Sequence, residues 1–206
     1  MPFTPLHYPL AFVLSKANKK LILPGLVVGA VIPDIEVPIM RVFFSDLPDH
    51  LFLHSLVGAA TVGTTIAVLV TWLLYAPLIS TIFGVDKSTL KKTCSLSSIL
   101  VLSCLIGVLS HLLLDYPMHW FNPILWPWVN PYDIVGPLVL FFAPYGPING
   151  TAFWMANGLA NAVMIVASIP ILLYHRDKDL WSNLWLGKPR VEDLQCPGTY
   201  HSSRDM

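Results

Sequence analysis

The alternation of long apolar runs with short polar segments predicts a helical membrane protein. A bilayer core of about 30 Å is crossed by about 20 apolar residues in helical form. Four runs of that kind lie between the charged segments of the chain, at residues 21–40, 53–83, 96–114 and 153–174. Pro33, Asp34 and Glu36 interrupt the first run. We therefore expect an all-α, polytopic membrane protein with about four transmembrane helices.

Segments outside these runs complete the predicted fold. The apolar piece at residues 6–15 is too short to span a bilayer, and we expect a half-length helix that folds back on the first span through the polar turn at residues 16–20. Residues 116–150 are rich in proline and tryptophan, which predicts an interfacial cap, and residues 137–143 of it could dip into the lipid. A helical membrane domain at residues 1–175 is thus followed by a polar tail at residues 176–206, which we expect to be partly disordered.

The positions of the basic residues predict the orientation of the chain. They gather as Lys16, Lys19 and Lys20, then as Lys87, Lys91 and Lys92, and again in the tail from Arg176 onward. Four spans would place all three clusters on one side, which the positive-inside rule assigns to the cytoplasm. We therefore expect a multi-pass protein of the cytoplasmic (inner) membrane, with the N-terminal lysine cluster and the C-terminal tail in the cytoplasm.

The composition agrees with a membrane protein and limits its partners. Hydrophobic residues make up 55% of the 206 residues and charged residues only 12%, a balance outside the range of soluble domains. The formal net charge is zero, so nucleic acid is not an expected partner and the lipid bilayer is. Cys94, Cys104 and Cys196 are far apart and form no metal-binding Cys-x-x-Cys motif. The sequence gives no indication of the oligomeric state.

Ionisable residues near membrane depth point to a functional site, because such residues need a partner or a role. Asp34 lies 14 residues beyond the basic turn, about 21 Å along a helix. His54 opens the second span, which runs back, and His111 and Asp115 close the third. The folded-back helix places His7 at the same end. We therefore expect these five residues, from four segments, to meet near the extracytoplasmic face.

The residue types in this group predict a metal site. His111 and Asp115 are four residues apart and share a helix face, so both can touch one ion. Imidazole nitrogen with carboxylate oxygen suits zinc, manganese or iron, whereas magnesium and calcium sites are mostly oxygen. Structural zinc sites usually contain cysteine, and none is placed to help, so a catalytic site is favoured. The predicted ligands are His7, Asp34, His54, His111 and Asp115.

Simpler interpretations exist for each of these residues taken alone. His50, His119 and His175 stand near the ends of apolar runs, where an interfacial polar residue is the ordinary interpretation. The pair His111 and Asp115 could form a hydrogen bond on a helix surface. Asp34 follows Pro33 and could cap a helix that restarts after a kink. These interpretations do not account for the convergence of all five predicted ligands.

Several short motifs resemble those of a known family. They are MPFTPLH at residues 1–7, GAVIPD at residues 29–34, His54-Ser55, and HLLLD at residues 111–115 followed by LWP at residues 125–127. In order and spacing, over about residues 1–130, they resemble the prokaryotic inner-membrane proteins called membrane-bound metal-dependent hydrolases. That family is distantly similar to the zinc-dependent phospholipases C and the single-strand-specific zinc nucleases, which are all-helical enzymes with a metal cluster.

The resemblance implies which metal ion each predicted ligand binds. Asp34, His54, His111 and Asp115 would surround one metal ion, and Asp115 would reach a second ion that His7 also binds. Those enzymes use a further histidine and a His-xxx-Glu pair for a third metal, and this chain contains no His-xxx-Glu. His119 could stand in for one of the missing ligands. We therefore expect one or two ions, with zinc first and manganese or iron as alternatives.

The expected activity is hydrolysis of a phosphoester in a lipid or lipid-linked substrate at the extracytoplasmic face. Asp34 could orient the attacking water or act as general base, or could equally be a ligand. Trp120, Trp126 and Trp128 in the cap would bind an apolar tail. A metal or proton transporter is an alternative, but the polar residues cluster at one face and form no column across the bilayer. A non-catalytic scaffold is another, and it predicts no bound metal.

Overall fold

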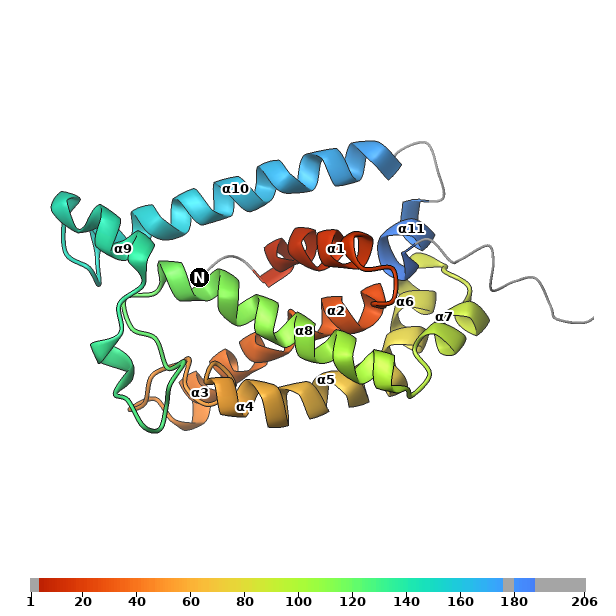
Figure 1. The fold of residues 1–206 in the computed structure, drawn as a ribbon, viewed down its shortest axis with the longest axis horizontal. Helices are drawn as coiled ribbons and strands as arrows, with labels where there is room; N and C mark the ends of the chain where they lie inside the picture. Colours follow the sequence, from red (N-terminus) through yellow and green to blue (C-terminus); the bar gives the residue numbers. More distant parts are fainter. Residues whose placement is uncertain (1–3, 176–179, 188–206) are drawn as a thin grey trace, which may run out of the picture.

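The computed structural model describes residues 4–175 and 180–187, and every regular element in these residues is helical (Figure 1). Three of its helices are long and apolar enough to cross a membrane: Leu56–Phe83, Ser98–Met118 and Thr151–Tyr174. The predicted class, a helical membrane protein, agrees with this architecture. The expected number of four transmembrane helices does not.

The predicted first span is broken into short helices. Residues 23–43 form α2 (Leu23–Gly29), the 3₁₀ turn η2 (Ile32–Ile35) and α3 (Glu36–Phe43). Pro33 lies in η2, and proline has no backbone N–H and a ring that clashes with the preceding turn of an α-helix. None of the three pieces is long enough to cross a bilayer alone. The break places Asp34 at a bend, where its side chain can face inward.

The N-terminal segment folds back as the sequence predicts. The 3₁₀ turn η1 (Thr4–His7) leads into α1 (Tyr8–Ala17), which packs along α2 (Figure 1). The helix Leu56–Phe83 is continuous and consists of α4 (Leu56–Gly58), η3 (Ala59–Gly63), α5 (Thr64–Val70), η4 (Thr71–Tyr75) and α6 (Ala76–Phe83), of which η3 and η4 are π-helical. The short helix α7 (Lys87–Thr93) connects it to α8 (Ser98–Asp115).

Helix α8 is central and crosses α2 with almost no space between the backbones. A Cβ atom added to Gly29 would lie 2.4 Å from the carbonyl oxygen of Cys104, and one added to Gly107 would lie 2.4 Å from that of Leu26. Small residues at a crossing allow such an approach in membrane proteins. The contact brings the end of α2 against the turn of α8 that carries His111.

The segment after α8 contains short helices in the cap, one long helix and a C-terminal helix. The region predicted as a cap contains η5 (Tyr116–Met118), η6 (Pro131–Asp133), α9 (Pro137–Phe142) and η7 (Ala143–Tyr145), and α10 (Thr151–His175) follows it. The predicted tail contains a helix that the sequence analysis did not predict, α11 (Leu180–Leu186). The hydroxyl of Tyr8 donates to the carbonyl of Leu184 at 2.8 Å, which fastens α11 to α1. Residues 176–179 and 188–206 of this tail lie outside the described part.

The chain runs between two ends of the bundle. Figure 1 shows α7 and α11 at one end, beside the start of α2, and α3 and α9 at the other. Two of the basic clusters, the lysines of α7 and those of the turn before α2, therefore share one end. The broken segment from α2 to α3 runs between the same two ends as the long helices.

Candidate metal centre

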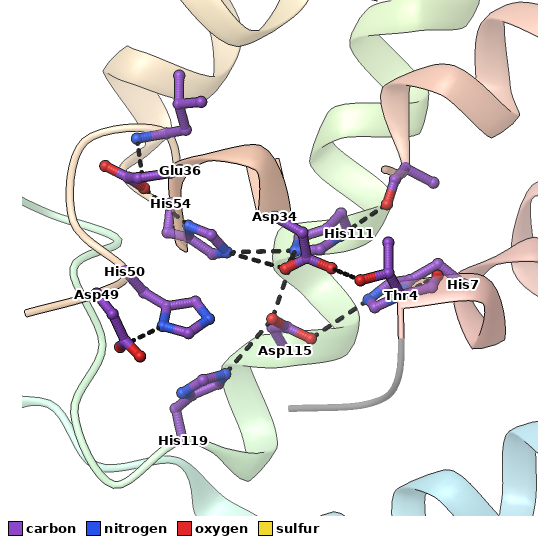
Figure 2. A network of polar contacts seen from close by, with 12 residues as sticks. Thr4, His7, Asp34, Glu36, Asp49, His50, His54, His111, Asp115 and His119 are labelled. Atoms are coloured by element: carbon purple, nitrogen blue, oxygen red, sulfur yellow. Dashed lines mark hydrogen bonds and ion pairs between the residues drawn. The ribbon is translucent and has the colours of Figure 1, made fainter. Parts of the chain in front are cut away.

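The five predicted ligands lie together in the interior, at the end of the bundle away from α7 (Figure 2). They come from different parts of the chain: η1, η2, the loop between α3 and α4, and the last turns of α8. Each is buried, with at most 9% of its surface exposed. The sequence analysis thus selected residues that the fold brings together, and their binding of a metal remains a prediction.

The cluster divides into two groups that share one carboxylate. Ligand atoms of Asp34, His50, His54 and Asp115 all lie within 4.8 Å of one another, and so do those of His7, His111 and Asp115. Asp115 Oδ1 lies 3.3 Å from His7 Nε2, and Asp115 Oδ2 lies 3.4 Å from His111 Nε2. Asp115 can therefore serve both groups, while His111 stands in the group of His7.

Backbone carbonyls fix two of the imidazole rings. Nδ1 of His111 donates to the carbonyl of Ala30 at 2.8 Å, and Nδ1 of His7 donates to the carbonyl of Thr4 at 3.1 Å. A carbonyl oxygen only accepts, so each Nδ1 carries a hydrogen and the neutral ring keeps its lone pair on Nε2. Metal-binding histidines are held in this way by an acceptor on their outer side.

Carboxylates hold the other two rings. His54 Nδ1 lies 3.0 Å from Glu36 Oε2, and His50 Nδ1 lies 2.7 Å from Asp49 Oδ1. Hydrogen bonds from His50 and Arg41 hold the pKa of Asp49 well below its usual range. Burial lowers the pKa of His50 to about 4, although Asp49 opposes this shift. At neutral pH an ionised Asp49 thus accepts from a neutral His50, and the lone pair of that ring is on Nε2.

Two buried carboxylate oxygens, Asp34 Oδ1 and Asp115 Oδ2, have no hydrogen-bond donor among the described residues. The first lies 3.5 Å from His111 Nε2 and 3.8 Å from His54 Nε2, beyond hydrogen-bond distance. The other oxygen of Asp34, Oδ2, accepts from the hydroxyl of Thr4 at 2.6 Å. A buried anionic oxygen without a hydrogen-bond donor is costly, and the imidazoles at 3.4–3.8 Å offset this cost only when a ring is protonated. A cation among these atoms would remove the cost.

The electrostatics of His54 also favour a positive charge at this place. Burial by itself lowers the pKa of His54, but the carboxylates of Asp34 and Glu36 outweigh it and raise the pKa to about 9. The space between His54 and Asp34 therefore favours a positive charge, which a proton or a metal ion can supply. Nitrogen and oxygen donors without sulfur suit zinc, manganese or iron. The residues fit a divalent cation, and the arrangement does not single out one metal.

A pocket gives access to the first group. Its wall includes His50, His54 and Asp115 from the cluster, and His119, Tyr116 and Asn122 from the segment after α8. Structural metal sites are usually closed by protein ligands, whereas catalytic sites keep a side open to substrate. The pocket has room for about one water molecule, so it can place a water beside His50, His54 and Asp115.

His50 lies in the first group and His119 lies beside it. The sequence predicted both as interfacial polar residues, with His119 also as a substitute for a missing ligand. Only 4% of His50 and 6% of His119 is exposed, and Nε2 of His119 lies 3.4 Å from Asp115 Oδ2. The sequence did contain a signal for His119. It follows Asp115 by four residues, the same spacing as between His111 and Asp115. Glu36, which holds His54, was also missed as part of the site. The side chain of His175 lies outside the described part.

Two of the three tryptophans proposed to bind substrate pack against other aromatic rings, and the third is exposed. Trp126 packs edge-on against Phe52 with ring centroids 6.2 Å apart, and Trp120 contacts the ring of Tyr132 at 5.3 Å. Trp128 is 75% exposed. The pocket wall is formed by other residues. A substrate-binding role for the tryptophans remains a prediction.

Comparison with known proteins yields one family. Residues 1–122 match the family model described as "Domain of unknown function (DUF4184)". The matched part runs from the N-terminus past the end of α8 and contains every residue of the two groups. Searches of curated proteins and of solved structures find no match.

Proposed function

We propose that this chain, which belongs to the family described as a domain of unknown function (DUF4184), is a membrane-bound metal-dependent hydrolase. The substrate we propose is a phosphoester in a lipid or lipid-linked molecule. One observation carries the proposal. Among the described residues, two buried carboxylate oxygens without hydrogen-bond donors face imidazole nitrogens, and a small pocket is lined by one of the two residues, Asp115.

The two groups assign the metal-binding roles. Asp34, His50, His54 and Asp115 would hold one ion, and His7, His111 and Asp115 would hold a second. When bound, a divalent ion lowers the pKa of water toward neutrality and polarises a phosphoryl oxygen. Zinc is the expected metal, with manganese or iron as alternatives. The outer acceptors of the imidazoles keep the rings in place during turnover.

Asp34 is the residue we assign to proton transfer. The hydroxyl of Thr4 holds Oδ2, so the carboxylate cannot rotate freely, and Oδ1 remains without a donor. Oδ1 is thus the atom available to orient an attacking water and accept its proton. The same oxygen faces His54 and His111, so Asp34 combines this role with the holding of the ion.

The location of the site supports a lipid substrate. The basic clusters lie at the end of the bundle opposite the centre, and the positive-inside rule assigns that basic end to the cytoplasm. The site would then lie at the extracytoplasmic face of the cell membrane. An apolar hollow beside it is lined by Leu114, Met118 and Leu138, and by Leu159 and Val163 of α10. This hollow offers room for an apolar tail.

The test is a hydrolysis assay on purified protein in lipid vesicles. Protein loaded with zinc, manganese or iron is mixed with phosphodiester and phosphomonoester lipids, and released head group or phosphate is measured. The proposal expects turnover by the wild type and loss of it in His111→Ala. Gly158→Ala is the matched control, because a Cβ at Gly158 meets nothing within 4 Å. Metal flux into the vesicles without hydrolysis would instead establish a transporter.

A further inference from the structure

The loop at residues 44–55 carries two residues of the first group without any helix or strand of its own. It joins the end of α3 to the start of α4 and holds His50 and His54. A ligand must be held close to its productive position if a metal is to bind tightly. Some other part of the chain must therefore fix this loop.

Glu36, the first residue of α3, makes the contacts that fix it. Only 5% of the surface of Glu36 is exposed. Its carboxylate accepts hydrogen bonds from three successive backbone N–H groups of the loop. These belong to Leu51, Phe52 and Leu53, and Oε2 lies 3.2 Å and 3.0 Å from the first and the third. Successive N–H groups of this kind form a concave anion site. The carboxylate thus clamps the loop between His50 and His54.

The same carboxylate also holds a ligand directly. Oε2 of Glu36 lies 3.0 Å from Nδ1 of His54, while Asp34 Oδ1 lies 3.8 Å from Nε2 of the same ring. Two carboxylates only two residues apart therefore face opposite nitrogens of one imidazole. Both oxygens of Glu36 are occupied by donors. This leaves Asp34 as the carboxylate of the pair that faces the cluster.

We infer that Glu36 is a positioning residue for the metal centre, acting through the His54 ring and the backbone of the histidine loop. The inference rests on the metal-binding part of the proposed function and is independent of the hydrolytic part. Glu36 keeps a hydrogen on Nδ1 of His54, so that Nε2 is the nitrogen turned to the ion. A carboxylate in this position orients the histidine and strengthens its binding to the metal. Mutation of such a carboxylate typically weakens metal binding about 10- to 100-fold.

The test compares cobalt or zinc affinity in Glu36→Gln and in a matched loop variant, Ser55→Ala. Ser55 is also buried and holds the same loop, since its side chain donates to the carbonyl of Phe52 at 2.7 Å and accepts from the N–H of Gly58 at 3.0 Å. Neither of these hydrogen bonds involves a predicted ligand. Hydrogen exchange at residues 51–53 in metal-free protein reports the clamp. Metal titration reports the effect on the site.

Glu36→Gln should lose amide protection at residues 51–53 and bind metal about 10- to 100-fold more weakly, whereas Ser55→Ala should stay within about twofold of the wild type. Lost protection with unchanged affinity would show a purely structural role and overturn the inference. If Glu36→Gln does not fold, ¹⁵N spectra of the zinc-loaded wild type test the inference instead. They must show the hydrogen of His54 on Nδ1, and a metal on Nδ1 would overturn the inference. A wild type that binds metal but hydrolyses nothing would contradict the hydrolase alone.

Discussion

Nε2 of His54 and Nε2 of His111 lie 3.3 Å apart and face each other. The opposite nitrogen of each ring is held by an acceptor outside the pair. If both rings were neutral, their Nε2 lone pairs would repel at this distance, so a proton or a metal ion near both nitrogens stabilises the arrangement. Asp34 and Asp115 add negative charge on the same side. Donor atoms of both types are therefore concentrated in one buried place.

The protein should contain bound metal after purification in detergent. We expect one or two equivalents of zinc, manganese or iron in the wild type, as measured by mass spectrometry of metal content. Asp34→Asn and His111→Ala should each lose the ion of its own group, because Asp34 belongs only to the first group and His111 only to the second. Circular dichroism establishes matched folding. Background metal in the wild type, even after the ions are added back, would favour the scaffold interpretation.

Two variants should separate the two groups by stoichiometry. Asp115 contributes to both groups and His7 only to one. Asp115→Ala should therefore remove all bound metal, whereas His7→Ala should retain the ion held by Asp34, His50 and His54. The measurement is metal per chain at saturation. Equal losses in the two variants would mean that the cluster holds a single ion.

Metal binding should strengthen as the pH rises toward 9. The pKa of His54 is raised to about 9, so below that pH the ring carries a proton that must leave before Nε2 can bind an ion. Loss of one proton changes the apparent affinity about tenfold per pH unit. The dissociation constant should thus be about tenfold higher at pH 7 than at pH 8. Calorimetry in buffers of different ionisation enthalpy measures how many protons are released when the metal binds. A metal affinity that does not change between pH 7 and pH 8 would contradict the prediction.

The sequence was sufficient to find the core of the candidate site because the ligand positions follow from simple rules. His111 and Asp115 share a helix face by their spacing, and alternating span directions bring His54 to the same end. The fold-back of the N-terminal helix, which the structure contains, adds His7. These inferences need only helix periodicity and a count of crossings.

What the sequence did not provide depends on loop geometry and tertiary packing. Glu36 and Asp49 became parts of the site through hydrogen bonds to His54 and His50, which depend on the conformation of an irregular loop. The first apolar run was predicted to cross the membrane although Pro33, Asp34 and Glu36 interrupt it, because its length and hydropathy suit a span, whereas the structure breaks it into short helices. Helix α11 was missed because its polar neighbours outweigh a short apolar face, which becomes stable only against α1 and the second span.

The crossing of α2 and α8 should tolerate no added methyl group at Gly107. A Cβ there would lie 2.4 Å from the backbone carbonyl oxygen of Leu26, which cannot move without displacing α2. We expect Gly107→Ala to lower the free energy of unfolding by about 1–3 kcal/mol, as overpacking typically does. Displacement of α2 would also strain the hydrogen bond from His111 to Ala30, so metal affinity should fall in parallel. Gly158→Ala on α10 is the control, because it meets open space and gains helix propensity. Thermal unfolding in detergent, with and without metal, measures both effects. An unchanged unfolding temperature for Gly107→Ala would show that the two helices do not pack as closely as described.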